Sequence, residues 1–380
     1  MSRPIVAEIL PNALQANLAC VRRQAPGARI WAVIKAHAYG HGLDAALQGL
    51  AGSDGLALVE FDSAARLRAL GYAGPLLMLE GAFDPSDLEQ ARAESLTLVV
   101  HNADQLKWLE ALPPDQGAGS LKDPIPTGLP RGPAGLPIWV KIDTGMHRLG
   151  FDPHDVAEVV TRIERLQSRG IVSTAGLMTH FANADQPGCI DPAISRWQAL
   201  RATLAAGRDW PVSLSNSAAI IDRLVIDSHW VRPGIMLYGA SPYADRTAQS
   251  LGLKPAMRLR SELISVRSIA AGEAVGYGSQ FVAPTAMTIG VVAAGYADGY
   301  PRHAPTGTPI EVAGCRTRIV GRVSMDMIAV DLQGVAHARV GSPVELWGDA
   351  VSVDEVAQCA GTIGYELLCA VAPRVPRRLI

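Results

Sequence analysis

The feature that most constrains the fold of this chain is a series of eight short apolar runs that alternate with stretches of helical periodicity. The runs are the length of buried strands, and several of the intervening stretches begin with Asp, Asn or Pro, which are typical of helix N-termini. A doubly wound sheet gives the same alternation, but eight βα units in about 240 residues favour an α/β fold with an N-terminal (β/α)8 TIM-type barrel. The runs are IWAVIK, GLALVE, PLLMLEG, LTLVVH, PIWVKID, STAGLMTH, PVSLSNS and HWVRPGIMLYG.

The composition changes near Ser241, where runs rich in Val, Ile and Thr are separated by Gly and Pro. This texture predicts a mostly β second domain, so we expect a barrel over residues 1–240 and a β domain over 241–380. The 380 residues, 48% of them apolar, are enough to fill two cores. The Pro- and Gly-rich stretch 113–137 predicts a long exposed loop that is mobile or disordered.

Charge and cysteine usage exclude several classes of partner. The net charge is 34 basic minus 36 acidic residues, or −2, and no segment concentrates Lys and Arg, so we expect a small-molecule substrate and neither nucleic acid nor a membrane. The five cysteines lack paired spacing, which indicates reduced thiols and no metal site. The segment MSRPIVAEILPNAL contains no long apolar region, and no later run approaches about 18 apolar residues, so we expect a cytoplasmic protein.

Polar side chains follow five of the predicted strands, at the end where a barrel builds its active site. Because all these strand ends share one mouth, we expect the side chains to converge there. They are Lys35 and Tyr39 after the first strand, Arg148 after the fifth, His180 at the end of the sixth, Asn216 and Ser217 after the seventh, and Arg232 and Gly234 after the eighth.

The stretch WAVIKAHAYGHG places Lys35 at the rim of the apolar barrel. Desolvation disfavours the charged form of such a lysine, so its amine can act as a nucleophile toward an aldehyde, as in proteins that bind pyridoxal 5'-phosphate (PLP). The stretches SNSAAI and VRPGIMLYG supply a hydroxyl, backbone N–H groups and a helix that begins near Asn216, which together predict a phosphate site.

Eight motifs together resemble the bacterial alanine racemase family, from about residue 3 to the C-terminus: AVIKAHAYGHG, VKIDTGMHRLGF, GLMTHFANAD, LSNSAAI, VRPGIMLYG, VGYGSQF, GYADGYPR and GRVSMDM. The resemblance implies a PLP enzyme with a barrel and a β domain that interconverts L- and D-alanine. It also implies a homodimer with shared active sites, and a role in supplying D-alanine for peptidoglycan or in degrading it.

The resemblance also implies a two-base mechanism. Lys35 corresponds to the lysine that binds PLP and acts as a base on one face of the substrate Cα. Tyr277 of the partner subunit corresponds to the base on the other face, which a tyrosine can be only where its phenolate is favoured. Arg232 corresponds to the arginine that faces the PLP ring nitrogen, and His180 to the residue that orients this arginine.

The remaining correspondences concern binding and access. Lys141 matches a lysine that is often carbamylated and that holds Arg148. By resemblance, the phosphate contacts are Tyr39, Ser217, Gly234 and Ile235, the substrate carboxylate contacts are Arg148 and Met325 of the second subunit, and the access channel is lined by Asp185, Tyr296, Arg302 and Arg322.

Three positions depart from the family pattern. His37 replaces an asparagine and Ser324 a cysteine, while Pro373 replaces a tyrosine whose hydroxyl reaches the cofactor phosphate. Pro373 therefore predicts weaker PLP binding or looser access, and whether Tyr365 compensates stays open.

Four alternative functions fit parts of the pattern. They are a racemase of another small amino acid such as serine, a PLP decarboxylase, a non-catalytic PLP-binding protein, and an enzyme whose Lys35 reacts directly with a sugar aldehyde. A decarboxylase would not need Tyr277, a PLP-binding protein would not need the whole β domain, and the sugar enzyme leaves Arg232 unexplained.

Overall fold

The computed structural model describes residues 3–114, 135–204, 209–224 and 227–380. These residues form two compact units. The barrel unit comprises Ala19–Ala36 and Gly52–Gly234, and the β unit comprises Met1–Leu18, His37–Ala51 and Ile235–Ile380. Residues 115–134 of the expected loop 113–137 lie outside the described residues.

The barrel unit is built on eight parallel strands that close on themselves. The last strand pairs with the first through Arg29↔Trp230 and Ile30↔Val231, which confirms the predicted TIM-type barrel and excludes an open doubly wound sheet. Each of the eight predicted runs overlaps one barrel strand. These are β2 (Arg29–Val33), β3 (Gly55–Leu58), β4 (Leu76–Met78), β5 (Leu96–Val100), β6 (Leu136–Lys141), β7 (Val172–Met178), β8 (Val212–Ser213) and β9 (Trp230–Val231).

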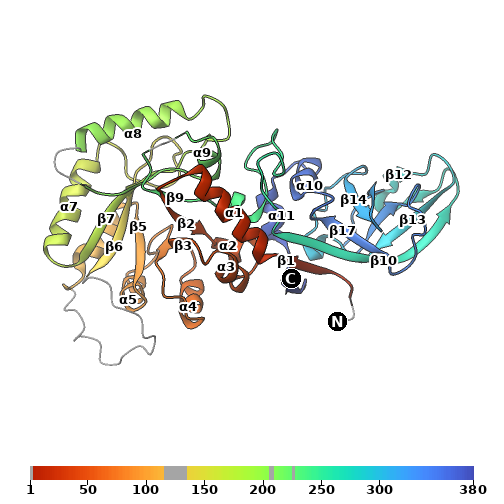
Figure 1. Cartoon of the computed structure of the whole chain (residues 1–380), viewed down its shortest axis with the longest axis horizontal. Helices are drawn as coiled ribbons and strands as arrows, with labels where there is room; N and C mark the ends of the chain where they lie inside the picture. Colours follow the sequence, from red (N-terminus) through yellow and green to blue (C-terminus); the bar gives the residue numbers. More distant parts are fainter. Residues whose placement is uncertain (1–2, 115–134, 205–208, 225–226) are drawn as a thin grey trace. The chain divides into compact units, whose positions relative to one another are not determined.

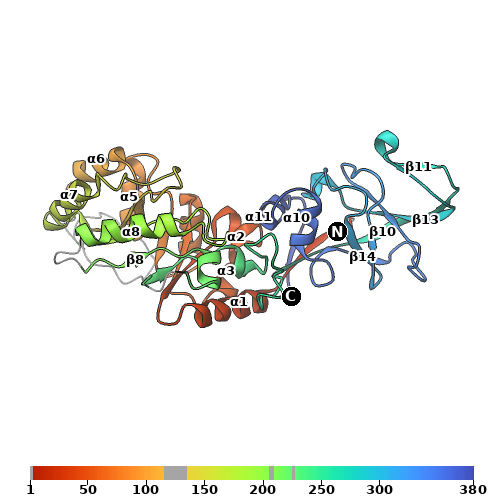
Figure 2. The same ribbon diagram turned by 90° about the horizontal axis from the view of Figure 1, so that it is seen from above.

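Helices lie on the outside of the barrel strands (Figures 1 and 2). In α7 (Val156–Ser168) the buried residues Val156, Val159, Val160 and Ile163 recur at helical spacing, so one apolar stripe packs on the barrel. The other helices along this part of the chain are α1 (Pro11–Gln24), α4 (Phe61–Ala69), α5 (Ser86–Ala93), α6 (Ala103–Ala111), α8 (Asp191–Leu204) and α9 (Ser217–Ile221).

Two glycines on the barrel strands make room for tryptophan rings. A Cβ added at Gly55 would lie 2.2 Å from the Trp31 ring, and one added at Gly176 would lie 2.7 Å from the Trp139 ring. Trp31 also stacks on Trp230 with 4.4 Å between ring centroids. Large rings beside glycines thus fill the barrel, as close packing requires.

The β unit is organised around the long strand β10 (Met257–Ile269), which pairs with β1, β13 and β17. β1 (Val6–Ile9) comes from the N-terminal end of the chain, pairs antiparallel with β10 (Val6↔Arg260), and lies parallel to β18 (Ala7↔Arg377) (Figure 1). The predicted β runs all overlap strands. The further strands are β11 (Ala274–Val275), β12 (Phe281–Val282), β13 (Met287–Val292), β14 (Pro309–Val312), β15 (Cys315–Arg318), β16 (Ile328–Asp331), β17 (Pro343–Trp347) and β18 (Arg377–Leu379).

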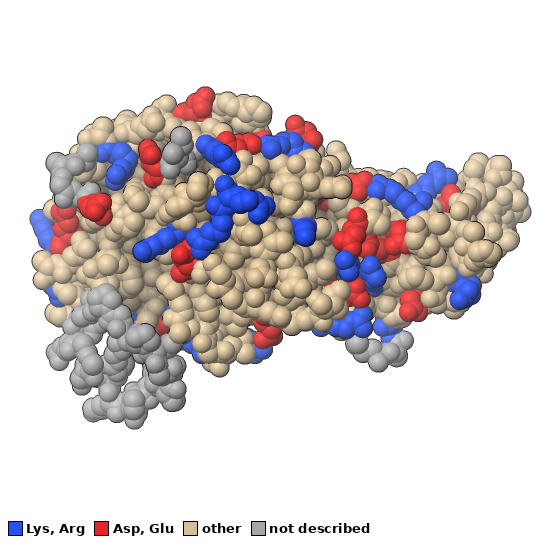
Figure 3. Space-filling view, in the orientation of Figure 1, with Lys and Arg blue, Asp and Glu red and all other residues tan. Residues whose placement is uncertain are grey.

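Short helices complete the β unit: α3 (Leu43–Gly49), α10 (Val353–Cys359) and α11 (Gly364–Ala370), with 3-10 turns η1 (Ile235–Tyr238), η2 (Tyr277–Ser279) and η3 (Tyr296–Asp298). The face drawn in Figure 3 carries both basic and acidic side chains, in keeping with the small net charge. Within the ranges that the structure describes, no helix has the length and apolar character needed to cross a membrane.

Candidate active site

Lys35 begins an unusual left-handed turn directly after strand β2. The turn, α2 (Lys35–Tyr39), has positive φ angles of 52°, 55°, 56° and 50° at Ala36, His37, Ala38 and Tyr39. L-residues avoid this conformation at a cost of roughly 1–2 kcal/mol each. Strain of this kind persists only where the surroundings enforce it, and it is concentrated at functional sites.

Two side chains, His41 and Arg377, make three polar contacts with the end of this turn. The Nδ1 of the buried His41 lies 3.1 Å from the Ala38 carbonyl oxygen and 2.9 Å from that of Tyr39. Arg377 Nε donates to the Gly40 carbonyl oxygen at 2.6 Å. Burial lowers the pKa of His41 to about 4, so the ring is neutral and Nδ1 can donate. Nothing in the sequence pattern assigns His41 a role beyond that of a solvated or core histidine.

Tyr39 is buried in an aromatic group. Its ring stacks on Tyr238 at 4.6 Å and is tilted against Tyr365 at 6.1 Å between centroids. Burial, with Tyr365 next in effect, raises the pKa of Tyr39 well above its usual range. Pro373 is exposed. Tyr365, in contrast, packs beside Tyr39.

At the end of the barrel, the charges of several predicted cationic side chains act on the pKa values of Lys141 and His180. Lys141 ends β6 and is 9% exposed. Burial, and after it the charges of Arg232 and Arg148, lower the pKa of Lys141 to about 8, and Lys35 acts in the same direction. His180 follows β7 and is partly buried. Burial and then Arg232 lower the pKa of His180 well below its usual value.

Arg232 directly follows β9, and its guanidinium donates three hydrogen bonds. It is 6% exposed, and burial lowers its pKa to about 10. Its Nη1 donates to Ser213 Oγ at 2.6 Å, and its Nη2 donates to the carbonyl oxygens of Thr179 at 2.5 Å and Leu214 at 3.3 Å. The sequence reasoning missed Ser213 and Thr179; a hydroxyl on the short strand β8, in the run PVSLSNS, was the available signal.

The loop after β8 leads into α9, as the sequence predicts. Asn216 caps this helix and accepts from the Ala219 N–H at 3.1 Å. Ser217 is buried, and its Oγ accepts from the Gly234 N–H at 3.0 Å. Ile235 is fully buried in η1, and Asp185 is exposed after β7.

Four of the predicted residues of the β unit lie at one cavity of about 580 Å³. Tyr277, Tyr296, Arg302 and Met325 all line it. Tyr277 is 70% exposed and Met325 53% exposed. Arg322 lies beside the Tyr277 turn, since a Cβ added at Gly278 would be 3.8 Å from Arg322 Nη1.

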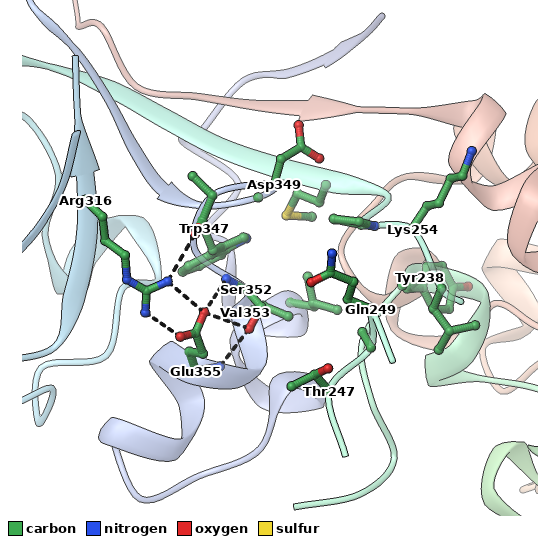
Figure 4. Close-up of a pocket in the computed structure, with 18 residues that line it drawn as sticks. Tyr238, Thr247, Gln249, Lys254, Arg316, Trp347, Asp349, Ser352, Val353 and Glu355 are labelled. Carbon is green, nitrogen blue, oxygen red and sulfur yellow. Dashed lines mark hydrogen bonds and ion pairs between the residues drawn. The ribbon is translucent and has the colours of Figure 1, made fainter. Parts of the chain in front are cut away.

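A second cavity of the β unit, about 510 Å³, contains none of the predicted site residues. Trp347 lies in its wall and Gln249 points toward its centre, while Arg316 and Glu355 form an ion pair at one edge (Figure 4). Over the ranges described, no group of His, Cys, Asp or Glu is arranged to hold a metal ion. The barrel end and the Tyr277 cavity therefore carry the candidate chemistry.

Known proteins resemble the whole chain. The family model "Alanine racemase, N-terminal domain" matches residues 9–242, and "Alanine racemase, C-terminal domain" matches residues 256–379. The alanine racemase of Nitrosospira multiformis is 51% identical over 377 residues, 99% of each chain. The catabolic alanine racemase of Salmonella typhimurium is 48% identical over 377 residues, again 99% of each chain. The crystal structure of the biosynthetic alanine racemase from Pseudomonas aeruginosa superposes with a TM-score of 0.87 and 44% identity, covering 100% of this chain and 99% of that one. The chain therefore belongs to the alanine racemase family of isomerases.

Proposed function

We propose that this chain interconverts L- and D-alanine with PLP bound at the end of its barrel. Family membership supports the reaction, and the observation that carries it is the group of cations Lys35, Lys141, Arg148 and Arg232 in one electric field. Such a group of positive charges is stabilised by anions. Glu80 acts on Lys141 in this sense, and the phosphate of PLP and the carboxylate of alanine would supply further negative charge.

The residues present fit PLP. Lys35 offers an amine for the cofactor aldehyde, and the Ser217 hydroxyl and the loop at Gly234 offer polar groups for its phosphate. Tyr39 and Ile235 would complete the phosphate contacts. Arg232, fixed by three hydrogen bonds, would face the ring nitrogen and keep it unprotonated, with His180 beside it. When bound, PLP stabilises the negative charge left on the substrate Cα after the proton is removed.

The two bases would come from two subunits of a homodimer. Lys35 Nζ would move the α-proton on one face of the substrate, and the Tyr277 hydroxyl of the second subunit would move it on the other. The 70% exposure of Tyr277 leaves its side chain accessible to a second subunit. Arg322 lies beside the Tyr277 turn and would therefore be close to this second base.

Arg148 and the Met325 N–H would hold the substrate carboxylate, and Asp185, Tyr296, Arg302 and Arg322 would line the access channel. Lys141 would be carbamylated: with a pKa of about 8, part of its population is neutral at physiological pH and can react with CO2. The reaction releases a proton and leaves an anion, which the charges of Arg148 and Arg232 would stabilise. We further propose a cytoplasmic enzyme that supplies D-alanine for peptidoglycan or degrades it.

The decisive experiment is incubation of the purified protein with PLP and L-alanine in deuterated water. Chiral chromatography with mass detection should find D-alanine that carries deuterium at Cα. If neither enantiomer exchanges its α-proton, the proposal is wrong, and serine is the next substrate to test.

Two variants test the bases separately. Lys35→Ala should lose both the visible absorbance of the covalently bound cofactor and the activity. Tyr277→Phe should keep the absorbance and lose mainly proton transfer on one face. Full activity of Tyr277→Phe in both directions would contradict the two-base assignment.

A further inference from the structure

The function proposed above assigns no role to an ion-pair cluster of the β unit. At its centre the Asp298 side chain is fully buried, and its carboxylate accepts three hydrogen bonds. Arg3 Nη1 and Arg374 Nε donate to Oδ1 at 2.5 and 2.8 Å, and the Gly295 N–H donates to Oδ2 at 2.9 Å. Burial alone would raise the pKa of Asp298, but these donors outweigh it and hold the pKa below its usual range.

The same two arginines also reach Asp326, which directly follows Met325. Arg374 Nη2 donates to Asp326 Oδ1 at 2.5 Å, and Arg3 Nη2 donates to the Asp326 carbonyl oxygen at 2.7 Å. Each arginine therefore bridges the turn that ends at Asp298 and the loop that contains Met325.

The turn and the loop are also in direct backbone contact. The Tyr296 N–H donates to the Ser324 carbonyl oxygen at 3.1 Å, and the Ala297 N–H donates to that of Met325 at 3.0 Å. A Cβ added at Gly295 would lie only 2.3 Å from the Met325 carbonyl oxygen. With no spare room between them, a shift of one segment must displace the other.

We infer that Arg374 is a positioning residue that fixes the Met325 loop and the Tyr296 turn at the cavity that both line. The inference rests on the proposed function, in which the Met325 N–H binds the substrate carboxylate and Tyr296 lines the access channel. Arg374 suits this task because its planar fork reaches two different carboxylates, which a lysine cannot do in the same geometry.

The test is steady-state racemisation by the PLP-loaded Arg374→Ala variant. The KM for L-alanine should rise about tenfold, the equivalent of one charge-assisted hydrogen bond, and kcat should change by less than about twofold, since carboxylate binding serves ground and transition states alike. Arg374→Lys should give an intermediate KM. The cofactor absorbance should not change, because Lys35 is not altered.

Arg378→Ala is the matched control, since it removes another exposed arginine of the β unit, paired with Glu8 at 2.7 Å. If its KM rises as much as that of Arg374→Ala, or if Arg374→Ala changes kcat and leaves KM unaltered, the positioning role is refuted. Should Arg374→Ala fail to fold, Asp326→Ala removes the carboxylate that accepts from Arg374 Nη2 and should raise KM in the same direction. An unchanged KM of Asp326→Ala would also refute the positioning role. An inactive wild-type protein would instead overturn the proposed function.

Discussion

Arg232 shows how a buried charge depends on neighbours that carry no charge themselves. Ser213 Oγ accepts from Arg232 Nη1 at 2.6 Å while donating to the Trp230 carbonyl oxygen at 3.0 Å. The serine hydroxyl is thus oriented by one bond to stabilise the guanidinium through the other. Loss of a hydrogen bond to a buried charge is more costly than loss of a neutral one.

We therefore expect Ser213→Ala to lower the free energy of unfolding by about 2 kcal/mol and to reduce racemisation. Urea unfolding and the rate of D-alanine formation measure the two effects. Ser173→Ala is the control, because Ser173 Oγ of β7 is buried without a hydrogen-bond partner in the described part of the chain. If both variants lose equal stability, the bond to Arg232 is not the cause.

His41 makes a pH-dependent contribution to stability. Burial lowers its pKa to about 4, whereas an unfolded histidine titrates near about 6.5. Between these values the unfolded chain binds more protons than the folded one, so acid favours unfolding and stability rises with pH across this window. Below about pH 4 the whole pH-dependent contribution of His41 to stability is lost.

His41→Gln should be less stable than the wild type at pH 7, and the difference should shrink as the pH falls from about 6.5 to about 4. Unfolding curves at several pH values measure it. His154→Gln, at an exposed histidine, shows the effect of the substitution outside the turn. A difference for His41→Gln that stays constant with pH would contradict the assignment.

At the scale of the element, the left-handed turn α2 depends on a glycine beyond its end. Gly40 has φ +79°, and an added Cβ would lie 2.1 Å from the Leu368 carbonyl oxygen. Gly27 has a similar φ of +82° but nothing within 4 Å of an added Cβ. Comparing substitutions at Gly27 and Gly40 therefore distinguishes the cost of backbone strain from the cost of steric overlap.

Gly27→Ala should cost about 1 kcal/mol, whereas Gly40→Ala should cost about 3 kcal/mol or more and weaken PLP binding, because Lys35 and Tyr39 lie on the same turn. Unfolding free energies and titration of the cofactor absorbance test this. Equal costs at both positions would show that contact with α11 does not constrain the turn.

At the scale of the whole molecule, a mixed dimer tests whether each active site is shared between two subunits. If Lys35 and Tyr277 at one site come from different subunits, a mixed dimer of Lys35→Ala and Tyr277→Phe chains has one site with both bases and one with neither. Random mixing should restore about a quarter of wild-type activity, since half of the dimers are mixed and half of their sites are intact. Mixing after unfolding and refolding, followed by the racemisation assay, measures it. No recovery would contradict sharing.

The fold was predictable because its signals are local. All eight barrel strands overlap predicted runs, and three of them begin one residue before the run. Periodicity of apolar residues decides strand or helix over a few residues, so no distant contact is needed. Strand β1 was not predicted: its four residues pair with β10 and β18, from distant parts of the chain.

The residue types at the site were readable in the same way, because Lys35, Arg148 and Arg232 follow strands whose ends meet in any closed barrel. The residues that hold these groups in place could not be predicted from the sequence. Ser213, Thr179 and His41 act through hydrogen bonds whose geometry depends on the packing of neighbouring strands and turns.

The sequence by itself determined the barrel, the β-rich second part and the family, since these depend on local periodicity and on motifs within the chain. The tertiary structure alone decided the left-handed turn that carries Lys35, the hydrogen bonds that fix Arg232, and the link from Arg374 through Asp298 and Asp326 to Met325. Residues far apart in sequence make these contacts, and only the folded chain brings them within hydrogen-bond distance.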